Sequence, residues 1–118
     1  MATPTQEEQA KAAQAAALAA WQAGQIANEL YDKTQERPFS DRDVERVLKS
    51  KSLGVWRYRH EKGQPRYDFY HPETELFVAW QPDEEGYQSQ IKTCFRCARI
   101  ESYMNNQSDV VCLRQPKR

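Results

Sequence analysis

The sequence lacks an apolar run of the roughly 18 residues that a membrane span requires. Residues 10–20 are mostly alanine, which is too weakly hydrophobic to anchor in lipid. The stretch after Met1 has no basic region followed by a strongly apolar one, so we expect no secretory signal. Together these absences predict a soluble chain that does not enter a membrane.

Cysteine is also scarce. The three cysteines are an odd number and too few for a disulfide scaffold, which favours a reducing compartment, and we expect the protein to act in the cytoplasm. Cys94 and Cys97 have the spacing of half a zinc site or a redox pair, but tetrahedral zinc needs two more ligands. Residues three apart on a strand also point to opposite faces, so we predict neither a metal site nor a cofactor.

What is present suits a small core. The chain has 118 residues, of which 39% are hydrophobic and 29% are charged, and this length fits one domain. We expect an N-terminal helix and linker over residues 1–38 and an α+β domain over residues 39–118, together forming one compact unit.

The formal net charge of zero hides a segregation along the chain. Residues 46–71 carry seven Lys or Arg and two acids, residues 72–86 carry five acids and no base, and residues 87–118 carry six bases and two acids. Two basic segments therefore flank an acidic one. If the basic segments share one face of the fold, they favour a polyanionic partner.

The first part of the chain has the composition of a helix. Residues 5–31 are rich in Gln, Ala, Lys and Leu, and Thr5 with Glu8 has the pattern of a capping box. Larger apolar residues occur only in the second half. We expect that half to pack on the domain and the first half to project or to mediate association, with Gly24 interrupting or bending the helix. A dimer formed through this helix is one outcome of such a pattern.

A second, short helix is predicted over residues 41–51. Ser40 has the position of an N-cap, and the apolar residues that follow it form one stripe. From Gly54 onward the hydrophobic period becomes that of a strand. Residues 98–106 fit either a helix or a continued strand. The predicted strands cover residues 54–60, 66–71, 76–81, 87–97 and 110–113.

These elements predict an α+β fold. An Ala-rich N-terminal helix and a short second helix precede a four- to five-stranded antiparallel meander. Turns are expected where Gly63 follows strand one and where Pro72 follows strand two.

Basic and aromatic residues alternate along the predicted strands. Cations neutralise phosphates and flat rings stack on unpaired bases, so the pattern suits nucleic acid. A solvated sheet face with its aromatic residues in the core is the simpler interpretation and stays open. The residues of this candidate face are Arg57, Arg59, Arg66, Lys92 and Arg96, with Tyr58, Tyr70, Trp80 and Tyr87 nearby.

The two histidines are candidates for proton transfer because imidazole titrates near neutral pH. His71 precedes Pro72, where a structural hydrogen bond is the simpler interpretation. His60 follows Arg57 and Arg59 at the end of strand one and is the better candidate.

The run RYDFYHPETELFVAWQPDEEGYQSQIKTCF, residues 66–95, resembles the end of small ribonuclease toxins of the barnase, EndoU, colicin and RelE-like grouping. The matching pieces are residues 67–72, residues 76–80 and Lys92-Thr93-Cys94-Phe95, about thirty residues in all. The sequence departs from the grouping in two ways. Its second helix carries Arg46 and no histidine, and the Ala-rich helix lies outside the shared pattern.

The resemblance implies a bacterial or phage toxin that cleaves RNA, often tRNA, without a metal ion, and that has a cognate inhibitor protein. It implies attack by the ribose 2′-hydroxyl on the adjacent phosphate. His60 is then the base or acid, Arg57 or Arg59 holds the phosphate together with Lys92, and Thr93 positions the substrate. Arg57, together with Arg66, Tyr58 and Arg96, is expected to bind the RNA.

Two other functions stay open. The chain could be a non-enzymatic adaptor or regulator that binds a protein through the sheet or the N-terminal helix, in which case apolar positions such as Trp21, Ile26 and Trp80 carry the function. Binding of nucleic acid without cleavage is the third hypothesis, and it predicts affinity that falls steeply with salt.

Overall fold

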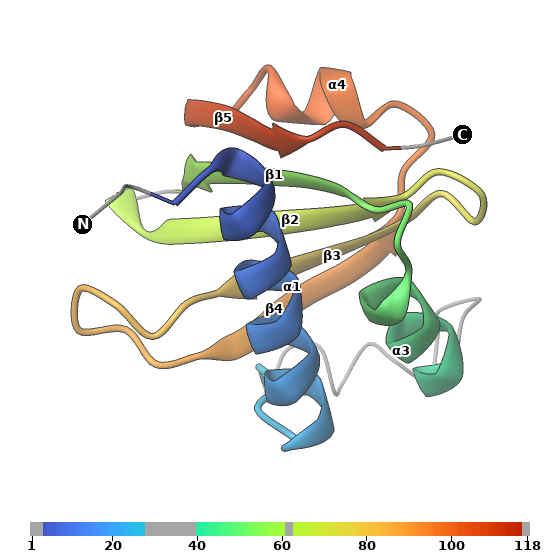
Figure 1. Ribbon diagram of the computed structural model, residues 1–118, viewed down its shortest axis with the longest axis horizontal. Helices are drawn as coiled ribbons and strands as arrows, with labels where there is room; N and C mark the ends of the chain where they lie inside the picture. The colour runs from blue at the N-terminus through green and yellow to red at the C-terminus, as the bar shows by residue number, and fades with distance from the viewer. Residues whose placement is uncertain (1–3, 28–39, 61–62, 117–118) are drawn as a thin grey trace.

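A five-stranded antiparallel sheet forms the centre of the molecule, with helices on both of its faces (Figure 1). The computed structural model describes residues 4–27, 40–60 and 63–116. The expected α+β fold, with two helices ahead of an antiparallel sheet, is confirmed. In chain order the elements are α1 (Gln6–Gln22), α3 (Asp41–Lys49), β1 (Gly54–Arg59), β2 (Pro65–His71), β3 (Leu76–Gln81), β4 (Gln90–Arg96), α4 (Ile100–Met104) and β5 (Ser108–Arg114).

The strands lie in the order β4-β3-β2-β1-β5. The first four form the predicted meander, each paired with the next. The fifth strand crosses back to pair with β1, where Arg57 aligns with Val111. Between β4 and β5 the undecided segment forms the short helix α4 rather than continued strand. Strand four begins at Gln90, three residues later than expected.

Helix α1 starts as the sequence predicts and ends early. The Thr5 side chain accepts a hydrogen bond from the Glu8 backbone N–H and Glu8 reaches back to Thr5, which completes the capping box. At the other end, Gly24 has φ +74°, a left-handed conformation that glycine adopts without a steric penalty. Ile26 then forms a parallel bridge with Ile91 at the edge of β4. The helix predicted over residues 5–31 is therefore too long, because α1 ends at Gln22 and residues 23–27 are not helical. Residues 28–31 lie outside the described ranges.

The first half of α1 packs on the sheet, so the expectation that it projects is wrong. The helix buries alanines at positions separated by three or four residues, and Leu18 and Trp21 add partly buried contacts at its second half. Alanine lets the helix approach the strands closely, which lets a weakly hydrophobic stripe contribute to the core. The buried alanines are Ala10, Ala13, Ala17 and Ala20.

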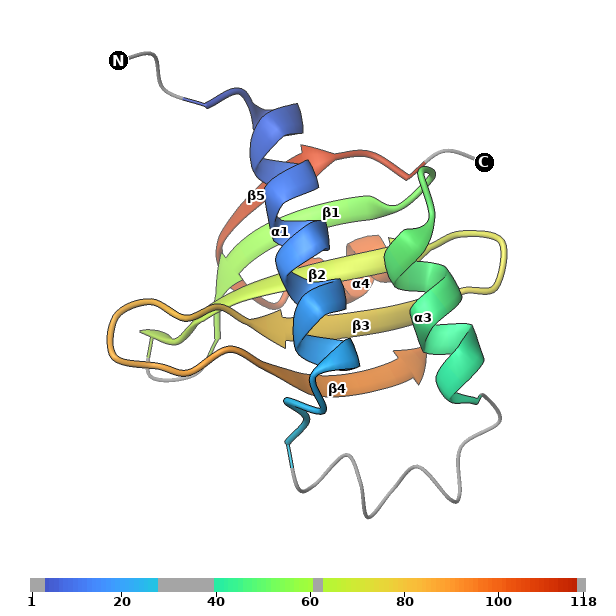
Figure 2. The same cartoon turned by 60° about the horizontal axis from the view of Figure 1, so that its bottom comes forward.

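The sheet has two buried faces. Val55, Phe69, Val78 and Cys94 lie in register across four strands and pack with α1 and α3, which cover the same side of the sheet (Figure 2). We call this the α1/α3 face. The opposite side, the α4 face, carries a second apolar cluster beneath α4. Its members are Trp56, Tyr58, Tyr70, Phe77, Ala79, Ile100 and Met104.

Helix α3 ends at Lys49, two residues before the predicted end, and Lys51 lies in the following turn. Its Ser40 N-cap forms a capping box with Asp43, and the backbone N–H of Ser40 lowers the pKa of the Asp43 carboxyl. Val44, Val47 and Leu48 form its buried stripe. Among the described residues, no helix is both long and apolar enough to span a membrane.

Candidate functional site

The register between β1 and β2 places an acid, a base and a phenol on the α4 face. Tyr58 lies opposite Arg66, and Trp56 lies opposite Asp68. Because side chains alternate between faces along a strand, these four residues share one side of the sheet. Tyr58, Arg66 and Asp68 are all buried, which is unusual for the charged pair.

Asp68 is a completely buried carboxyl group. Its exposed fraction is 0%, and among the described residues neither of its oxygens has a hydrogen-bond partner within 3.5 Å. Burial raises the pKa of Asp68 well above its ordinary value, because loss of water disfavours the charged form. The Tyr58 hydroxyl and the Arg66 guanidinium act to lower this pKa, and burial outweighs them. Asp68 therefore keeps its proton to a higher pH than an exposed aspartate does.

Two tyrosines lie close enough to interact electrostatically with this carboxyl. Tyr58 is 1% exposed, and its hydroxyl is the hydrogen-bond donor that acts on the Asp68 pKa, although the two groups do not meet the geometry of a hydrogen bond within 3.5 Å. Tyr103 of α4 packs edge-on against Phe77 and Phe95, with ring centroids 5.0 and 5.7 Å apart. Burial raises the pKa of both phenols, and the charge of Asp68 raises them further. Both therefore remain neutral hydroxyl groups.

Strands β3 and β4 extend this row toward the sheet edge. Asp68 aligns with Ala79, and Ala79 aligns with Thr93. Adjacent strands lie about 4.8 Å apart, so the backbones at Asp68 and Thr93 are about 10 Å apart. Ala79 presents only a methyl group between them. Ile100 and Met104 of α4 pack in the same cluster as Ala79 and cover the row.

Arg57 and Arg59 lie on the other side of the sheet, so the expectation that all the basic residues share one face is wrong. Arg57 aligns with Tyr67, which packs in the α1/α3 core, whereas Arg66 aligns with Tyr58. Both arginines pair with the acidic β3–β4 loop. Arg57 Nη2 lies 3.6 Å from Glu84 Oε1, and Arg59 Nη1 donates a short hydrogen bond to Glu85.

The pairing of Arg59 with Glu85 shifts the pKa of both side chains. The hydrogen bond with Glu85 raises the pKa of Arg59 and lowers the pKa of Glu85. Glu84 and Glu85 of the acidic segment thus pair with two arginines of the first basic segment. That contact offsets much of the positive charge that the sequence assigned to a polyanionic partner.

The other predicted site residues are dispersed along the sheet. His60 follows β1 directly, and its backbone N–H and C=O bond to Gln64 and Gly63 at 2.8 and 2.9 Å. Lys92 lies at an irregularity of β4 and donates to Gln90 at 3.3 Å. Arg96, at the exposed end of β4, donates to the Thr74 carbonyl at 2.7 Å. Among the eight catalytic and RNA-binding residues predicted from the sequence, Tyr58 and Arg66 lie directly opposite each other, and Thr93 shares their face.

His71 and the cysteines have structural surroundings. His71 is 4% exposed and its Nδ1 lies 2.8 Å from the Thr74 hydroxyl, as the simpler interpretation predicted. Cys94 packs in the α1/α3 core and Cys97 against the cluster of the α4 face, so the two thiols do not converge. Within the ranges that the structure describes, no three His, Cys, Asp or Glu side chains are grouped as metal ligands.

Asp68 was not among the site residues predicted from the sequence. The signal available was an acid in the middle of an alternating aromatic strand, Arg66-Tyr67-Asp68-Phe69-Tyr70, where both faces turn out to be buried. Comparisons with protein-family models, with curated proteins and with solved structures find no match to this chain. The geometry of the α4 face is therefore the observation that bears on function.

Proposed function

We propose that this protein is a ribonuclease that cleaves RNA without a metal ion, with Asp68 as its proton donor. The observation that supports this most is the completely buried Asp68 carboxyl with a raised pKa, beside the Arg66 guanidinium. A carboxylic acid that keeps its proton to a higher pH can act as a general acid, and perturbed acids concentrate at catalytic sites. A cation at the same place suits a phosphate.

The reaction needs one base and one acid. His60 lies four residues along the chain from Trp56, the residue opposite Asp68, which is about 13 Å and too far for both side chains to act on one phosphate. Water therefore accepts the proton of a ribose 2′-hydroxyl, whose oxygen forms a bond to the adjacent phosphorus. The bond from phosphorus to the 5′-oxygen breaks, and Asp68 donates its proton to that oxygen. The products are a 2′,3′-cyclic phosphate and a 5′-hydroxyl end, and Asp68 takes up a proton from water before the next cycle.

Arg66 and Thr93 have supporting roles in this proposal. Arg66 holds the non-bridging phosphate oxygens, where charge increases in the transition state. Thr93, two strands away from Asp68, positions the substrate through its hydroxyl, as the resemblance implies. Arg57 and Arg59 have no part in the chemistry because they lie on the α1/α3 face and pair with Glu84 and Glu85.

RNA can reach Asp68 only when α4 moves, because this helix covers the row. The helix has five residues, and its N-cap residue Arg99 makes no side-chain capping bond. Such a short, uncapped helix is held mainly by its packing on the sheet. Cytoplasmic RNA is the proposed substrate class, tRNA is the first substrate to test, and a toxin of this kind is expected to have an inhibitor protein.

The test incubates the purified protein with total tRNA and ribosomal RNA in EDTA and separates the products on a gel. Discrete fragments with 2′,3′-cyclic phosphate ends are expected. Asp68→Asn should lower the cleavage rate by about 100-fold or more, the usual effect of removing a general acid, whereas His60→Ala should keep most of the rate. Arg57→Gln, changed on the opposite face, is the matched control and should keep the rate.

Three results contradict the proposal. Intact RNA at high protein concentration would mean that the chain has no such activity. Cleavage that survives Asp68→Asn would remove Asp68 from the mechanism. Cleavage lost in Arg57→Gln and kept in Arg66→Gln would move the active site to the α1/α3 face.

A further inference from the structure

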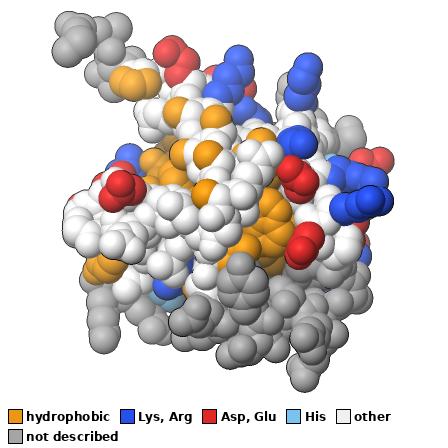
Figure 3. Space-filling view, turned by 90° about the horizontal axis from the view of Figure 1, so that it is seen from below, with side chains coloured by type: hydrophobic (Ala, Val, Ile, Leu, Met, Phe, Trp, Pro, Cys, Tyr) orange, Lys and Arg blue, Asp and Glu red, His pale blue; other side chains and the backbone are white. Residues whose placement is uncertain are grey.

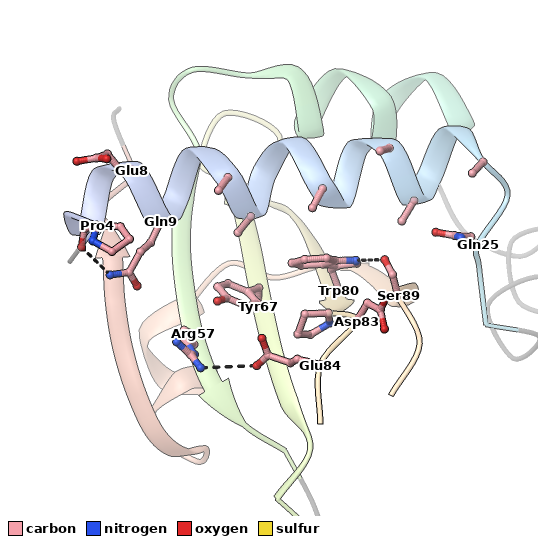
Figure 4. Close-up of a pocket in the computed structure, with 17 residues that line it drawn as sticks. Pro4, Glu8, Gln9, Gln25, Arg57, Tyr67, Trp80, Asp83, Glu84 and Ser89 are labelled. Atoms are coloured by element: carbon pink, nitrogen blue, oxygen red, sulfur yellow. Dashed lines mark hydrogen bonds and ion pairs between the residues drawn. The ribbon is translucent and has the colours of Figure 1, made fainter. Parts of the chain in front are cut away.

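A groove of about 920 Å³ lies between α1 and the sheet on the α1/α3 face, away from Asp68 (Figure 4). One wall is α1, and the floor is formed by rings of β2 and β3. The β3–β4 loop forms the rim opposite the helix. Its volume is that of a substantial binding site, and the groove is separate from the chemistry proposed above.

The wall is a row of small side chains on the exposed side of α1. Ala12, Ala16, Ala19 and Ala23 line the groove, and each is exposed. At 1.5 Å per residue the row is about 16 Å long, which equals three turns of a helix. Figure 3 shows hydrophobic side chains spaced along this helix and in the hollow beside it.

The floor is aromatic and held in place. The Trp80 indole N–H donates a hydrogen bond of 2.9 Å to the Ser89 hydroxyl, and the Trp80 and Tyr67 rings lie 5.4 Å apart. The Arg57 guanidinium lies 5.8 Å from the centre of the Tyr67 ring. Rigid aromatic surfaces of this kind contribute strongly to protein interfaces and lose little entropy on binding.

The rim is acidic. Glu8 at one end and Asp83 and Glu84 on the loop face a single base, Arg57, which already pairs with Glu84. In addition, α1 has no basic residue in its last turn to offset the partial negative charge of its C-terminus. The groove therefore complements an apolar segment that carries positive charge at its flanks.

We propose that this groove binds an amphipathic helix of a partner protein, about three turns long, with apolar side chains on Trp80 and Tyr67 and Lys or Arg at its flanks. A helix satisfies its own backbone hydrogen bonds, which suits walls made of methyl groups and rings. The alanines let the two helix axes approach to about 8 Å. A second copy is a poorer occupant, because its α1 carries acids in its first turn and has Lys11 as its one base.

The proposal is independent of RNA cleavage and is tested on the isotope-labelled full chain by NMR titration. The probes are two synthetic helical peptides of about 16 residues with the same apolar stripe, one flanked by Lys and one by Glu. The Lys peptide is expected to bind about tenfold more tightly or better and to shift the Trp80 indole N–H and the α1 amides. Asp83→Lys should reduce this preference.

Matched variants locate the binding. Ala16→Gln places a neutral, helix-compatible side chain in the groove and should weaken binding about tenfold. Ala15→Gln, one residue away and exposed outside the groove, should leave affinity within about twofold. The proposal is overturned by the absence of binding, by equal binding of both peptides, or by shifts confined to the α4 face. Self-association of the chain alone that Ala16→Gln abolishes would assign the groove to a second copy instead.

Discussion

Arg114, at the end of β5, holds Glu7 in the first turn of α1 by two parallel hydrogen bonds. Nε donates to Oε2 at 3.1 Å and Nη2 donates to Oε1 at 3.0 Å, while Nη1 donates to Gln14 at 3.1 Å. The Arg114 side chain is only 10% exposed. The contact joins residues 107 positions apart and connects the edge strand to the helix that covers the sheet.

Replacing Arg114 by Lys is expected to lower the free energy of unfolding by about 1 kcal/mol. Lysine keeps the charge and loses the planar fork that matches the carboxylate, and Glu7 is partly exposed, which limits the loss. Urea unfolding followed by circular dichroism gives the measurement. Arg42→Lys on the exposed surface of α3 is the control. Equal unfolding midpoints for the two variants would show that the double hydrogen bond contributes nothing to stability.

Much of the sheet could be predicted because the signals were local. The strand period and the turn residues predicted the bounds of β1 and β2 to within one residue. Both ends of β3 were predicted correctly. Helix α1 was predicted too long because its composition stays helical beyond Gly24, and the backbone at this glycine decides where the helix ends. The burial of its first half was missed because alanine is a weak hydrophobic signal, although Ala10 is 0% exposed.

The candidate site was harder to predict because it depends on register. If the turn after β1 were one residue longer or shorter, Arg66 would lie on the same face as Arg57. The alternation of residues within one strand does not specify the length of that turn. The acidic loop was also assigned no structural role, although Glu84 and Glu85 pair with Arg57 and Arg59. Asp68 was overlooked because sequence gives no measure of burial for one acid among aromatic residues.

The packing of α1 against the sheet can be tested with two identical substitutions two residues apart. Ala17 is 0% exposed and Ala15 is exposed on the same helix. Ala17→Leu is expected to lower the free energy of unfolding by about 1–3 kcal/mol, because the larger side chain forces the helix away from the strands. Ala15→Leu should change it by less than about 0.5 kcal/mol. Similar values for the two variants in urea unfolding would contradict the close packing of α1.

Asp68 should make the protein less stable as the pH rises. Its folded-state pKa is raised above the ordinary value of 3.8, so the folded state binds a proton that the unfolded state has released between these two values. The stabilisation from this proton is fully present below pH 3.8 and is lost as the pH rises through the folded-state pKa. Between these two pKa values the free energy of unfolding falls by about 1.4 kcal/mol per pH unit. Asp68→Asn removes this dependence and should unfold at higher urea than the natural chain at pH 8.

Urea midpoints measured from pH 4 to pH 8 test this, with Asp83→Asn on the exposed loop as the control for losing a carboxylate. A natural chain that gains stability over Asp68→Asn as the pH rises would show that Asp68 is ionised and paired in the fold. The combination of higher stability and lost RNA cleavage in Asp68→Asn is the most informative result. If Asp68 served only the fold, Asp68→Asn would raise stability by removing a buried charge and would leave RNA cleavage unchanged.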